Sequence, residues 1–373
     1  MLKSRLCIAF FAFAVGCAPA QKPLTDYVNP MLGTATLWDS VDLGFKPTKR
    51  TWGAEVFPGS SLPNAMVQVS PVTKFHSGAG YQYEDSVIYG FTHTNKGHWN
   101  LCHIPLLPVT GTPTPGDYCS PFSHERESAA PGYYQVFLDR YGVDAQLSST
   151  LRCAFHKYTY PAGAAASLLA DLQRSNEHVR AWDIRKEGDN VFAGWQQTGE
   201  KMYFYAVANR PVTGIEPVVE GDREVRIVRF GEGDGALELR IGFSFVSEKN
   251  ARENLEAEML GKSFAEVRSE ATATWNDLLG RIRVEGGTER EKGLFYSSLY
   301  RSFLWPALRS DVNGEFTDVD GKVINPGFRY YTGPSYWDDY RNKLILLGML
   351  APDVAADVTS SDTDKGEKRG GFM

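Results

Sequence analysis

Tyr330-Tyr-Thr-Gly-Pro-Ser-Tyr-Trp-Asp-Asp-Tyr-Arg341 is the stretch on which the interpretation of this sequence depends. Ser335, followed three residues later by Asp338, fits a capping box and predicts that a helix begins here. The apolar residues that follow recur at helical spacing and predict one buried face, formed by Trp337, Tyr340, Leu344 and Leu347. Pro352 then ends the predicted helix.

This stretch combines aromatic rings, carboxylates and an arginine, a composition that suits the binding of a sugar. An indole ring such as that of Trp337 packs on the apolar face of a pyranose, and Asp338 can accept hydrogen bonds from its hydroxyls. A structural interpretation competes with this one. Asp338 would then only cap the helix, Trp337 would belong to the core, and Arg341 would pair with Asp338 three residues away. The residues alone leave both interpretations open.

A second helix is predicted just before this stretch. Phe295, Leu299 and Phe303 recur every four residues, Tyr296 and Tyr300 form a parallel row, and Pro306 ends the pattern. Asp311-Val-Asn-Gly314 follows and is typical of a turn. After Pro352 the chain is rich in Ser, Thr, Gly and Lys, and we expect Asp362 and Asp364 there to lie in a solvated loop.

The part of the chain before residue 248 is predicted to be mostly β-structure. Its short runs rich in β-branched and aromatic residues are separated by Gly, Pro, Asn and Asp, and they lie at 65–69, 87–91, 133–138, 191–195, 202–207 and 225–230. Many short strands without helices between them indicate a large sandwich. From residue 248 the period changes, and Phe264, Val267, Ala271 and Trp275 fall at helical spacing.

Several motifs in one order resemble glycoside hydrolase family 92, the calcium-dependent inverting α-mannosidases. They include the Trp337-Asp338 stretch, Gly293–Arg301, the opening Asp26–Thr34, and Phe57–Pro63 followed by Met66-Val-Gln68. The resemblance implies a multidomain β + α fold. A signal peptide (1–20) would precede a large N-terminal antiparallel β-sandwich (21–247), a helical linker (248–285), and the start of a truncated (α/α)6 barrel (286–373).

The same resemblance implies a partial sugar site. Trp337 would shape the mannose subsite, and Asp338 would bind sugar hydroxyls. Beside these two, we predict Arg341, His93 and Trp99 as substrate-binding residues. A structural role for His93 remains the alternative. The general acid, the general base and the calcium ligands are expected beyond Met373. Asn64 and Ala65 replace the usual Phe-Gly of the family, which leaves the linkage preference in doubt.

The resemblance implies an exported exo-acting α-mannosidase, with α-1,2-linked mannose in glycans as the expected substrate and inversion as the outcome. The alternative is a non-catalytic carbohydrate-binding protein built on the same sandwich. The formal net charge of −6, with scattered basic residues, argues against a nucleic-acid partner.

The first 20 residues have the pattern of a signal peptide. Lys3 and Arg5 precede the apolar run Leu6–Val15, and Ala18-Pro-Ala20 is a cleavage site that predicts Gln21 as the mature N-terminus. We therefore expect a periplasmic or secreted protein. The alternative is a lipoprotein anchored to the membrane through Cys17.

Three cysteines remain after the predicted cleavage, namely Cys102, Cys119 and Cys153. In an oxidising compartment Cys102 and Cys119 could pair, and an odd number leaves at least one thiol free. Cys102-His103 lies close to His93 and His98, which raises the question of zinc. A zinc site is disfavoured, because no C-x-x-C or H-E-x-x-H pattern is present.

Overall fold

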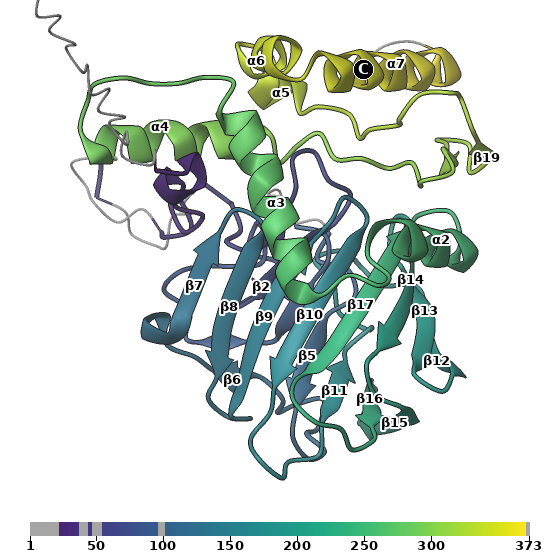
Figure 1. Ribbon diagram of the computed structural model, residues 1–373. Helices are drawn as coiled ribbons and strands as arrows, with labels where there is room; N and C mark the ends of the chain where they lie inside the picture. The colour runs from purple at the N-terminus through teal and green to yellow at the C-terminus, as the bar shows by residue number, and fades with distance from the viewer. Residues whose placement is uncertain (1–21, 37–43, 47–53, 96–100, 371–373) are drawn as a thin grey trace, which may run out of the picture.

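The computed structural model describes residues 22–36, 44–46, 54–95 and 101–370, and most strands between residues 60 and 244 belong to two large sheets that face each other (Figure 1). The seven-stranded sheet runs in the order β1 (Ser60–Ser61), β2 (Gln68–Val72), β4 (Gly90–Thr92), β5 (Leu106–Val109), β11 (Ser167–Ala170), β16 (Arg223–Phe230), β15 (Val212–Glu220). The eight-stranded sheet runs in the order β12 (Ala181–Gly188), β13 (Val191–Gln197), β14 (Lys201–Ala208), β17 (Leu237–Ser244), β10 (Cys153–Thr159), β9 (Val143–Ser149), β8 (Tyr133–Leu138), β7 (Glu127–Ala130). The predicted antiparallel β-sandwich is confirmed.

The remaining elements are short strands and helices. Two small pairs join β3 (Val87–Ile88) to β6 (Ser120–Pro121) and β18 (Phe316–Thr317) to β19 (Val323–Ile324). The helices are η1 (Leu24–Tyr27), η2 (His124–Arg126), α2 (Glu248–Glu258), α3 (Phe264–Leu279), α4 (Glu289–Ser302), α5 (Tyr336–Asp339), α6 (Lys343–Leu350) and α7 (Pro352–Arg369). In the described part of the chain, no helix has the length and mean hydropathy needed to cross a membrane.

The sheets are held together by side chains that alternate along each strand. In β14, Met202, Phe204, Ala206 and Ala208 are buried, whereas the residues between them are partly exposed. This period of two places one face of the sheet on the core and the other toward solvent or a covering helix. The run predicted at 202–207 therefore lies within the strand observed at Lys201–Ala208.

Helix α3 lies across the eight-stranded sheet and connects it to α4 (Figure 1). It begins at the capping box of Ser263 and Glu266 and buries the face predicted from the sequence, including Phe264 and Trp275. Trp275 Nε1 donates to the backbone oxygen of Ser61 at 2.7 Å, and its ring lies 4.4 Å from that of Tyr300 in α4. The sandwich and these helices therefore share one continuous core.

Residues near the N-terminus are fastened to α3 and α4 rather than to the strands that follow them. The amide of Thr25 in η1 donates to Asn276 Oδ1 at 3.1 Å, and the amide of Asn29 donates to Ser297 Oγ at 2.9 Å. Arg301 donates to the backbone oxygens of Pro30 and Leu32. The start and the later helices of the chain thus form one structural unit.

The single helix predicted from Ser335 to Pro352 is wrong. Helix α5 ends at Asp339, and Asn342 interrupts the helical path with φ −143° before α6 begins at Lys343. Asn competes with helix formation because its side chain bonds to nearby backbone. Leu347 is buried as predicted, whereas Trp337 and Tyr340 are 88% and 60% exposed.

The solvated loop predicted around Asp362 and Asp364 is also wrong, because both residues lie in α7. Pro352 takes a position in the first turn of this helix, where its missing N–H costs nothing. Val358 and Ser361 are buried against the rest of the molecule. Tertiary packing of this kind overrides the weak helix propensity of a Ser- and Thr-rich segment.

Candidate functional site

The segment that leads to the predicted sugar-binding residues is fastened to the sandwich by two buried amides, Asn64 and Gln68. Asn64 lies in the left-handed region with φ 52°, and its Nδ2 donates to the backbone oxygen of Pro306 at 2.8 Å. The backbone of Asn64 also bonds to Phe303 and Leu308. Gln68 Nε2 donates to the backbone oxygen of Leu304 at 2.9 Å.

Gln68 also holds one end of a sandwich loop. Its Oε1 accepts a hydrogen bond from the amide of Asn95 at 3.0 Å, and Asn95 forms an isolated bridge with Leu101. Trp99, a predicted substrate-binding residue, and His98 lie between these two positions and outside the described residues. The side chain of Gln68 therefore contacts both the base of this loop, at Asn95, and the segment around Leu304.

The chain after Leu304 pairs with residues 330–333, and this pairing fixes the position at which α5 begins. Leu308 and Tyr331 form an antiparallel bridge, and the amide of Thr332 donates to the backbone oxygen of Ala307 at 2.8 Å. Trp305 Nε1 donates to the backbone oxygen of Gly333 at 3.1 Å. These bonds fix the residues immediately before Ser335, where α5 starts.

Asp338 and Asp339 have different surroundings although they are adjacent. Asp338 is exposed, and its Oδ2 accepts a hydrogen bond from Ser335 Oγ at 2.7 Å. Asp339 is 4% exposed, accepts from the amide of Ser335 at 2.9 Å, and pairs with Lys343 Nζ at 3.0 Å. The predicted capping box is wrong, because the Ser335 side chain makes no cap bond to a backbone amide and instead donates to Asp338.

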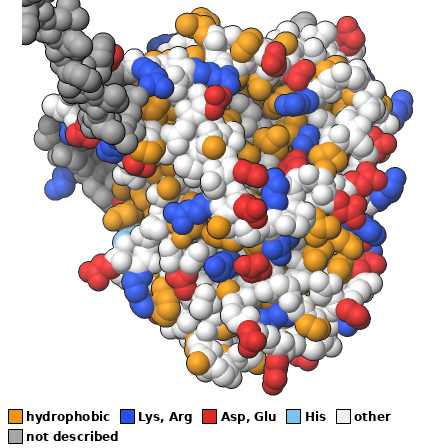
Figure 2. Space-filling model, in the orientation of Figure 1, with side chains coloured by type: hydrophobic (Ala, Val, Ile, Leu, Met, Phe, Trp, Pro, Cys, Tyr) orange, Lys and Arg blue, Asp and Glu red, His pale blue; other side chains and the backbone are white. Residues whose placement is uncertain are grey.

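Aromatic side chains around Asp338 are turned to the surface. Trp337, Tyr340 and Tyr336 are 88%, 60% and 49% exposed, and Figure 2 shows hydrophobic side chains among charged ones at the top of the view, where α5 and α6 lie. Arg341 Nε donates to the hydroxyl of Tyr340 at 2.8 Å. The interpretation of Trp337 as a core residue is therefore wrong, and its ring is available to a ligand.

Helix α7 forms the support beneath this surface. Asp362 Oδ2 accepts a hydrogen bond from the hydroxyl of Tyr336 at 2.7 Å, and its Oδ1 accepts from Lys365 Nζ at 3.2 Å. Lys365 Nζ also donates to the backbone oxygen of Tyr331 at 2.9 Å. Burial lowers the pKa of Lys365, and the charge of Asp362 partly offsets that effect. The carboxylate of Asp362 thus positions other residues.

A buried arginine lies where the sandwich meets the segment 303–311. Arg309 is 9% exposed, its Nη2 lies 3.4 Å from Glu200 Oε2, and its guanidinium stacks over Phe245 at 4.0 Å. Burial lowers the pKa of Arg309, although Glu200 and Glu177 act in the opposite direction. Since Glu200 and Phe245 come from the sandwich region, this contact joins two parts of the chain electrostatically.

Asp311 gives the predicted turn Asp311–Gly314 a second role, as a polar anchor. Its carboxylate accepts hydrogen bonds from Ser244 Oγ at 2.6 Å, Asn250 Nδ2 at 2.9 Å and Asn254 Nδ2 at 2.7 Å. Burial raises the pKa of Asp311 to about 6, while those three bonds and the charge of Arg152 act to lower it. The turn is thereby bound to β17 and α2.

His93 does not belong to the surface that carries Trp337, so its prediction as a substrate-binding residue is wrong. Its side chain is fully buried, its Nε2 lies 3.0 Å from Nε2 of His156, and its ring packs on Phe243 at 4.4 Å. Burial lowers the pKa of His93 to about 3, so the ring is neutral at pH 7. The histidine fills the interior of the sandwich, as its structural interpretation states.

The sequence matches two adjoining domain models of one glycosidase family. Residues 27–254 match the glycosyl hydrolase family 92 N-terminal domain, and residues 250–373 match the glycosyl hydrolase family 92 catalytic domain. The chain belongs to glycosyl hydrolase family 92.

Solved family 92 structures share this fold. A family GH92 alpha-mannosidase from Bacteroides thetaiotaomicron is 26% identical with a TM-score of 0.84, over 93% of this chain and 50% of that one. A family GH92 inverting mannosidase from the same organism is 25% identical with a TM-score of 0.80, over 94% of this chain and 50% of that one. An uncharacterized secreted glycosidase from Arthroderma benhamiae is 24% identical over an alignment 344 residues long, and the match covers 78% of this chain and 42% of that protein. The family 92 chain therefore spans about half the length of these relatives.

The residues of this family 92 chain that the structure describes do not fit a metal ion. They contain no cluster of three His, Cys, Asp or Glu side chains that could hold one. Calcium requires six to eight oxygen ligands at short distance.

Cys102, Cys119 and Cys153 are free thiols, so the pairing considered for Cys102 and Cys119 is absent in this structure.

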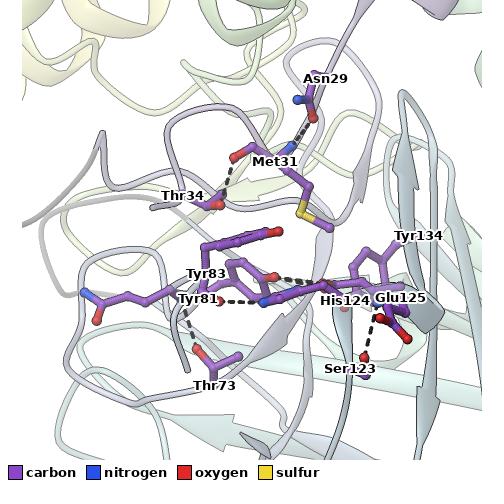
Figure 3. Close-up of polar contacts among 12 residues, drawn as sticks. Asn29, Met31, Thr34, Thr73, Tyr81, Tyr83, Ser123, His124, Glu125 and Tyr134 are labelled. Atoms are coloured by element: carbon purple, nitrogen blue, oxygen red, sulfur yellow. Dashed lines mark hydrogen bonds and ion pairs between the residues drawn. The ribbon is translucent and has the colours of Figure 1, made fainter. Parts of the chain in front are cut away.

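Sequence reasoning also missed a polar network around Glu127 at the edge strand β7. Its carboxylate accepts hydrogen bonds from the hydroxyls of Tyr81 at 3.0 Å and Tyr134 at 2.5 Å, and lies 2.6 Å from His124 Nδ1. Figure 3 shows Tyr81, Tyr134 and His124 gathered in this network, and the ring of His124 stacks on Tyr83 at 3.9 Å. Both carboxylate oxygens of Glu127 are thus engaged by the protein, which indicates a structural role.

Proposed function

We propose that this chain contains the sandwich and the first part of the catalytic domain of an exo-acting α-mannosidase that releases mannose from glycans. The observation that carries the proposal is the likeness of 93% of the chain to a family GH92 alpha-mannosidase, at a TM-score of 0.84. One structure of that mannosidase contains mannoimidazole, so the relative binds a mannose-like ligand. We further propose inversion at the anomeric carbon and a preference for α-1,2 linkages.

Three exposed side chains around α5 are proposed to hold the mannose. The ring of Trp337 would pack on the apolar face of the sugar, and Asp338 would accept hydrogen bonds from its hydroxyls. Arg341 would supply guanidinium N–H groups at the same surface. Asp338 lies in the first turn of α5, at an exposed position next to Trp337. Its proposed role is therefore binding.

The two carboxylates that inverting hydrolysis needs are proposed to lie in the remainder of the catalytic domain. Such carboxylates stand roughly 6.5–9.5 Å apart and leave room for the attacking water. Calcium is likewise proposed as a cofactor of the whole enzyme, with ligands outside the residues described.

The adjacent aspartates make a matched pair of variants for testing the sugar site. In the full-length enzyme, Asp338→Asn removes a charge from the sugar surface, and we expect kcat/KM on α-linked mannobiose to fall roughly 30- to 1,000-fold. Asp339→Asn removes a buried acceptor instead, so we expect it to lower the melting temperature. Trp337→Ala is expected to lower kcat/KM without a comparable loss of stability, because the ring is 88% exposed.

Two results would contradict these assignments. Near-normal kcat/KM in Asp338→Asn, together with a sharply lower melting temperature, would show that Asp338 is a structural acid. Tight binding of mannobiose by the full-length protein without any release of mannose would favour the second candidate function, a non-catalytic carbohydrate-binding protein.

We also propose that the protein is exported, since its relative from Arthroderma benhamiae is named a secreted glycosidase. The predicted signal peptide and Cys17 lie outside the described residues. Mass spectrometry of the mature N-terminus tests this proposal. A protein that begins at Gln21 supports cleavage by signal peptidase, a lipid-modified Cys17 supports the lipoprotein, and an intact N-terminus contradicts export.

A further inference from the structure

The connection between β11 and β12 lines a cavity of about 980 Å³ on the sandwich. Residues 173–182 form one wall, and residues from the segments after β2 and between β15 and β16 form the others. The half-buried aromatic rings of Phe75, Tyr89 and Trp182 face this cavity, which we call the β11–β12 pocket. Its volume is that of sites that bind small organic ligands.

Arg174 is held in this pocket by aromatic rings. Its guanidinium carbon lies 5.5 Å from the ring centre of Phe75, 5.3 Å from that of Tyr89 and 5.9 Å from that of Tyr118. Nη1 donates to the hydroxyl of Tyr118 at 3.3 Å, and Nε lies 3.7 Å from Asp171 Oδ2. The rings fix the plane of the guanidinium, while its side chain remains 34% exposed.

Arg174 shares its carboxylate with a second arginine of the pocket. Arg223 Nη2 donates to the same Asp171 Oδ2 at 2.8 Å, and Arg223 Nη1 donates to the backbone oxygen of Pro115 at 2.5 Å. The carboxylate of Asp171 is 1% exposed and also accepts from Tyr118 at 2.6 Å. One buried anion therefore holds two guanidinium groups beside one another at the pocket wall.

The charges of the pocket do not cancel. Lys74 and Arg180 add two exposed cations to the two arginines, while Glu177 and Asp222 are the carboxylates among the lining residues. Even with Asp171 included, four cations face three carboxylates, in a chain whose formal net charge is −6. Glu177 Oε2 is engaged by the amide of Gly199 at 3.0 Å. The pocket thus favours an anion.

We propose that the β11–β12 pocket binds an acidic saccharide unit, a sugar ring that carries a phosphate or a carboxylate. The aromatic rings offer flat apolar surfaces to the ring of the sugar, and the two guanidinium groups offer N–H donors to its anion. Arginine pairs with both kinds of anion in a planar, bidentate manner, so the shared chemistry is an oxyanion on a sugar. This proposal does not depend on the mannosidase activity.

Isothermal titration of the purified protein at low salt tests the proposal with mannose 6-phosphate, glucuronic acid, neutral mannose and inorganic phosphate. We expect at least one acidic sugar to bind roughly tenfold or more tightly than mannose, and the tighter of the two identifies the anion. Arg174→Gln is expected to weaken that binding roughly 10- to 100-fold, since a charged hydrogen-bond donor is lost. Trp182→Ala is expected to weaken binding of the acidic sugar and leave inorganic phosphate unaffected.

Arg252→Gln is the matched control, because Arg252 is an exposed arginine of α2 paired with Glu256 at 2.7 Å. Equal binding of mannose and both acidic sugars would overturn the proposal, as would inorganic phosphate binding as tightly as the tighter of the two acidic sugars. Equal losses in Arg174→Gln and Arg252→Gln would also overturn it. If Arg174→Gln does not fold, Trp182→Ala decides the question, and unchanged affinity for the acidic sugar then counts against the pocket.

Discussion

At the scale of single residues, the two neighbouring aspartates Asp338 and Asp339 have different surroundings and therefore suit different roles. Asp338 is exposed beside Trp337, whereas Asp339 is buried between the amide of Ser335 and Lys343. The helical turn decides this, because neighbouring positions on a helix point about 100° apart. A sugar-binding role is therefore open to the first aspartate, and a positioning role belongs to the second.

Asp311 is expected to make stability depend on pH. Burial raises the pKa of Asp311 to about 6 from its ordinary value of 3.8, so the folded state favours the protonated acid. The stabilisation is complete below pH 3.8 and is lost as the pH rises through about 6. Relative to Asp311→Asn, the native chain should gain on the order of 2–3 kcal/mol of unfolding free energy between pH 7.5 and pH 4.

The measurement is the difference in unfolding free energy between the two proteins across that pH range, since shared titrations then cancel. A difference that stays constant with pH would show that Asp311 has the same pKa in the folded and unfolded states. A difference that changes in the opposite direction would show that the bonds from Ser244, Asn250 and Asn254 outweigh burial.

At the scale of elements, the capping box of α4 is a measurable contribution to its stability. Thr288 accepts a hydrogen bond from the amide of Glu291 at 3.2 Å, and Glu291 accepts in return from the amide of Thr288 at 2.7 Å. Thr288→Ala should cost about 1 kcal/mol. Ser298→Ala is the control, because Ser298 is exposed on the same helix, and its cost should stay within about 0.5 kcal/mol.

Amide hydrogen exchange of α4 separates this effect from changes elsewhere. We expect faster exchange in the first turn of α4 for Thr288→Ala and unchanged exchange for Ser298→Ala. Equal protection in both variants would show that packing of Tyr296 and Tyr300, rather than the cap, fixes the start of the helix.

Elements with a strong period of their own were predictable from the sequence, and those that depend on distant partners were not. In β14 every second side chain is buried, and in α3 the buried side chains from Phe264 to Trp275 recur at helical spacing. In both elements the apolar pattern of the sequence alone identifies the buried face. Helix α7 has no such pattern and is held by bonds such as Lys365 Nζ to Tyr331, 34 residues away. His93 was misassigned for the same reason, since its partner His156 is 63 residues distant.

The candidate site was predictable only as far as its motif extends. The stretch around Trp337 and Asp338 marks a surface of exposed aromatic rings, but its fastening to the sandwich through Asn64 and Gln68 was missed. One sequence feature points to it, because Asn64 replaces the residue usual in the resembled family. Asn64, in a left-handed turn, bonds to three backbone groups of the facing segment, one through its side-chain amide and two through its own backbone.

At the scale of the whole molecule, the exposed apolar side chains of α5 and α6 are expected to cause self-association of the isolated 373-residue chain. Trp337, Tyr340, Ile345 and Met349 are 60% to 88% exposed. Large apolar side chains that are exposed on neighbouring segments mark an interaction site or an aggregation hazard where they form one patch. The mean mass by light scattering should therefore rise with concentration, and Ile345→Glu together with Met349→Glu should abolish that rise.

Val219→Glu is the control, because Val219 is 63% exposed on β15, away from α5 and α6. It should leave the association unchanged. A monomeric mass for the parent chain at every concentration would show that these side chains form no effective patch. If Val219→Glu also abolishes the association, the loss in the α6 variant results from added negative charge rather than from removal of the apolar side chains.

The fastening of η1 to α3 and α4 has a consequence for how the chain acquires its structure over time. The hydrogen bond of Thr25 cannot form until Asn276 has been synthesised, and that of Asn29 cannot form until Ser297 has been synthesised. The sequence separations are 251 and 268 residues. At roughly 5–20 residues per second of synthesis, the first segment stays without its native contacts for about 13–54 s. Residues 24–32 are thus made early and acquire these contacts late, which leaves them accessible to a chaperone for a long interval before α3 and α4 fold against them.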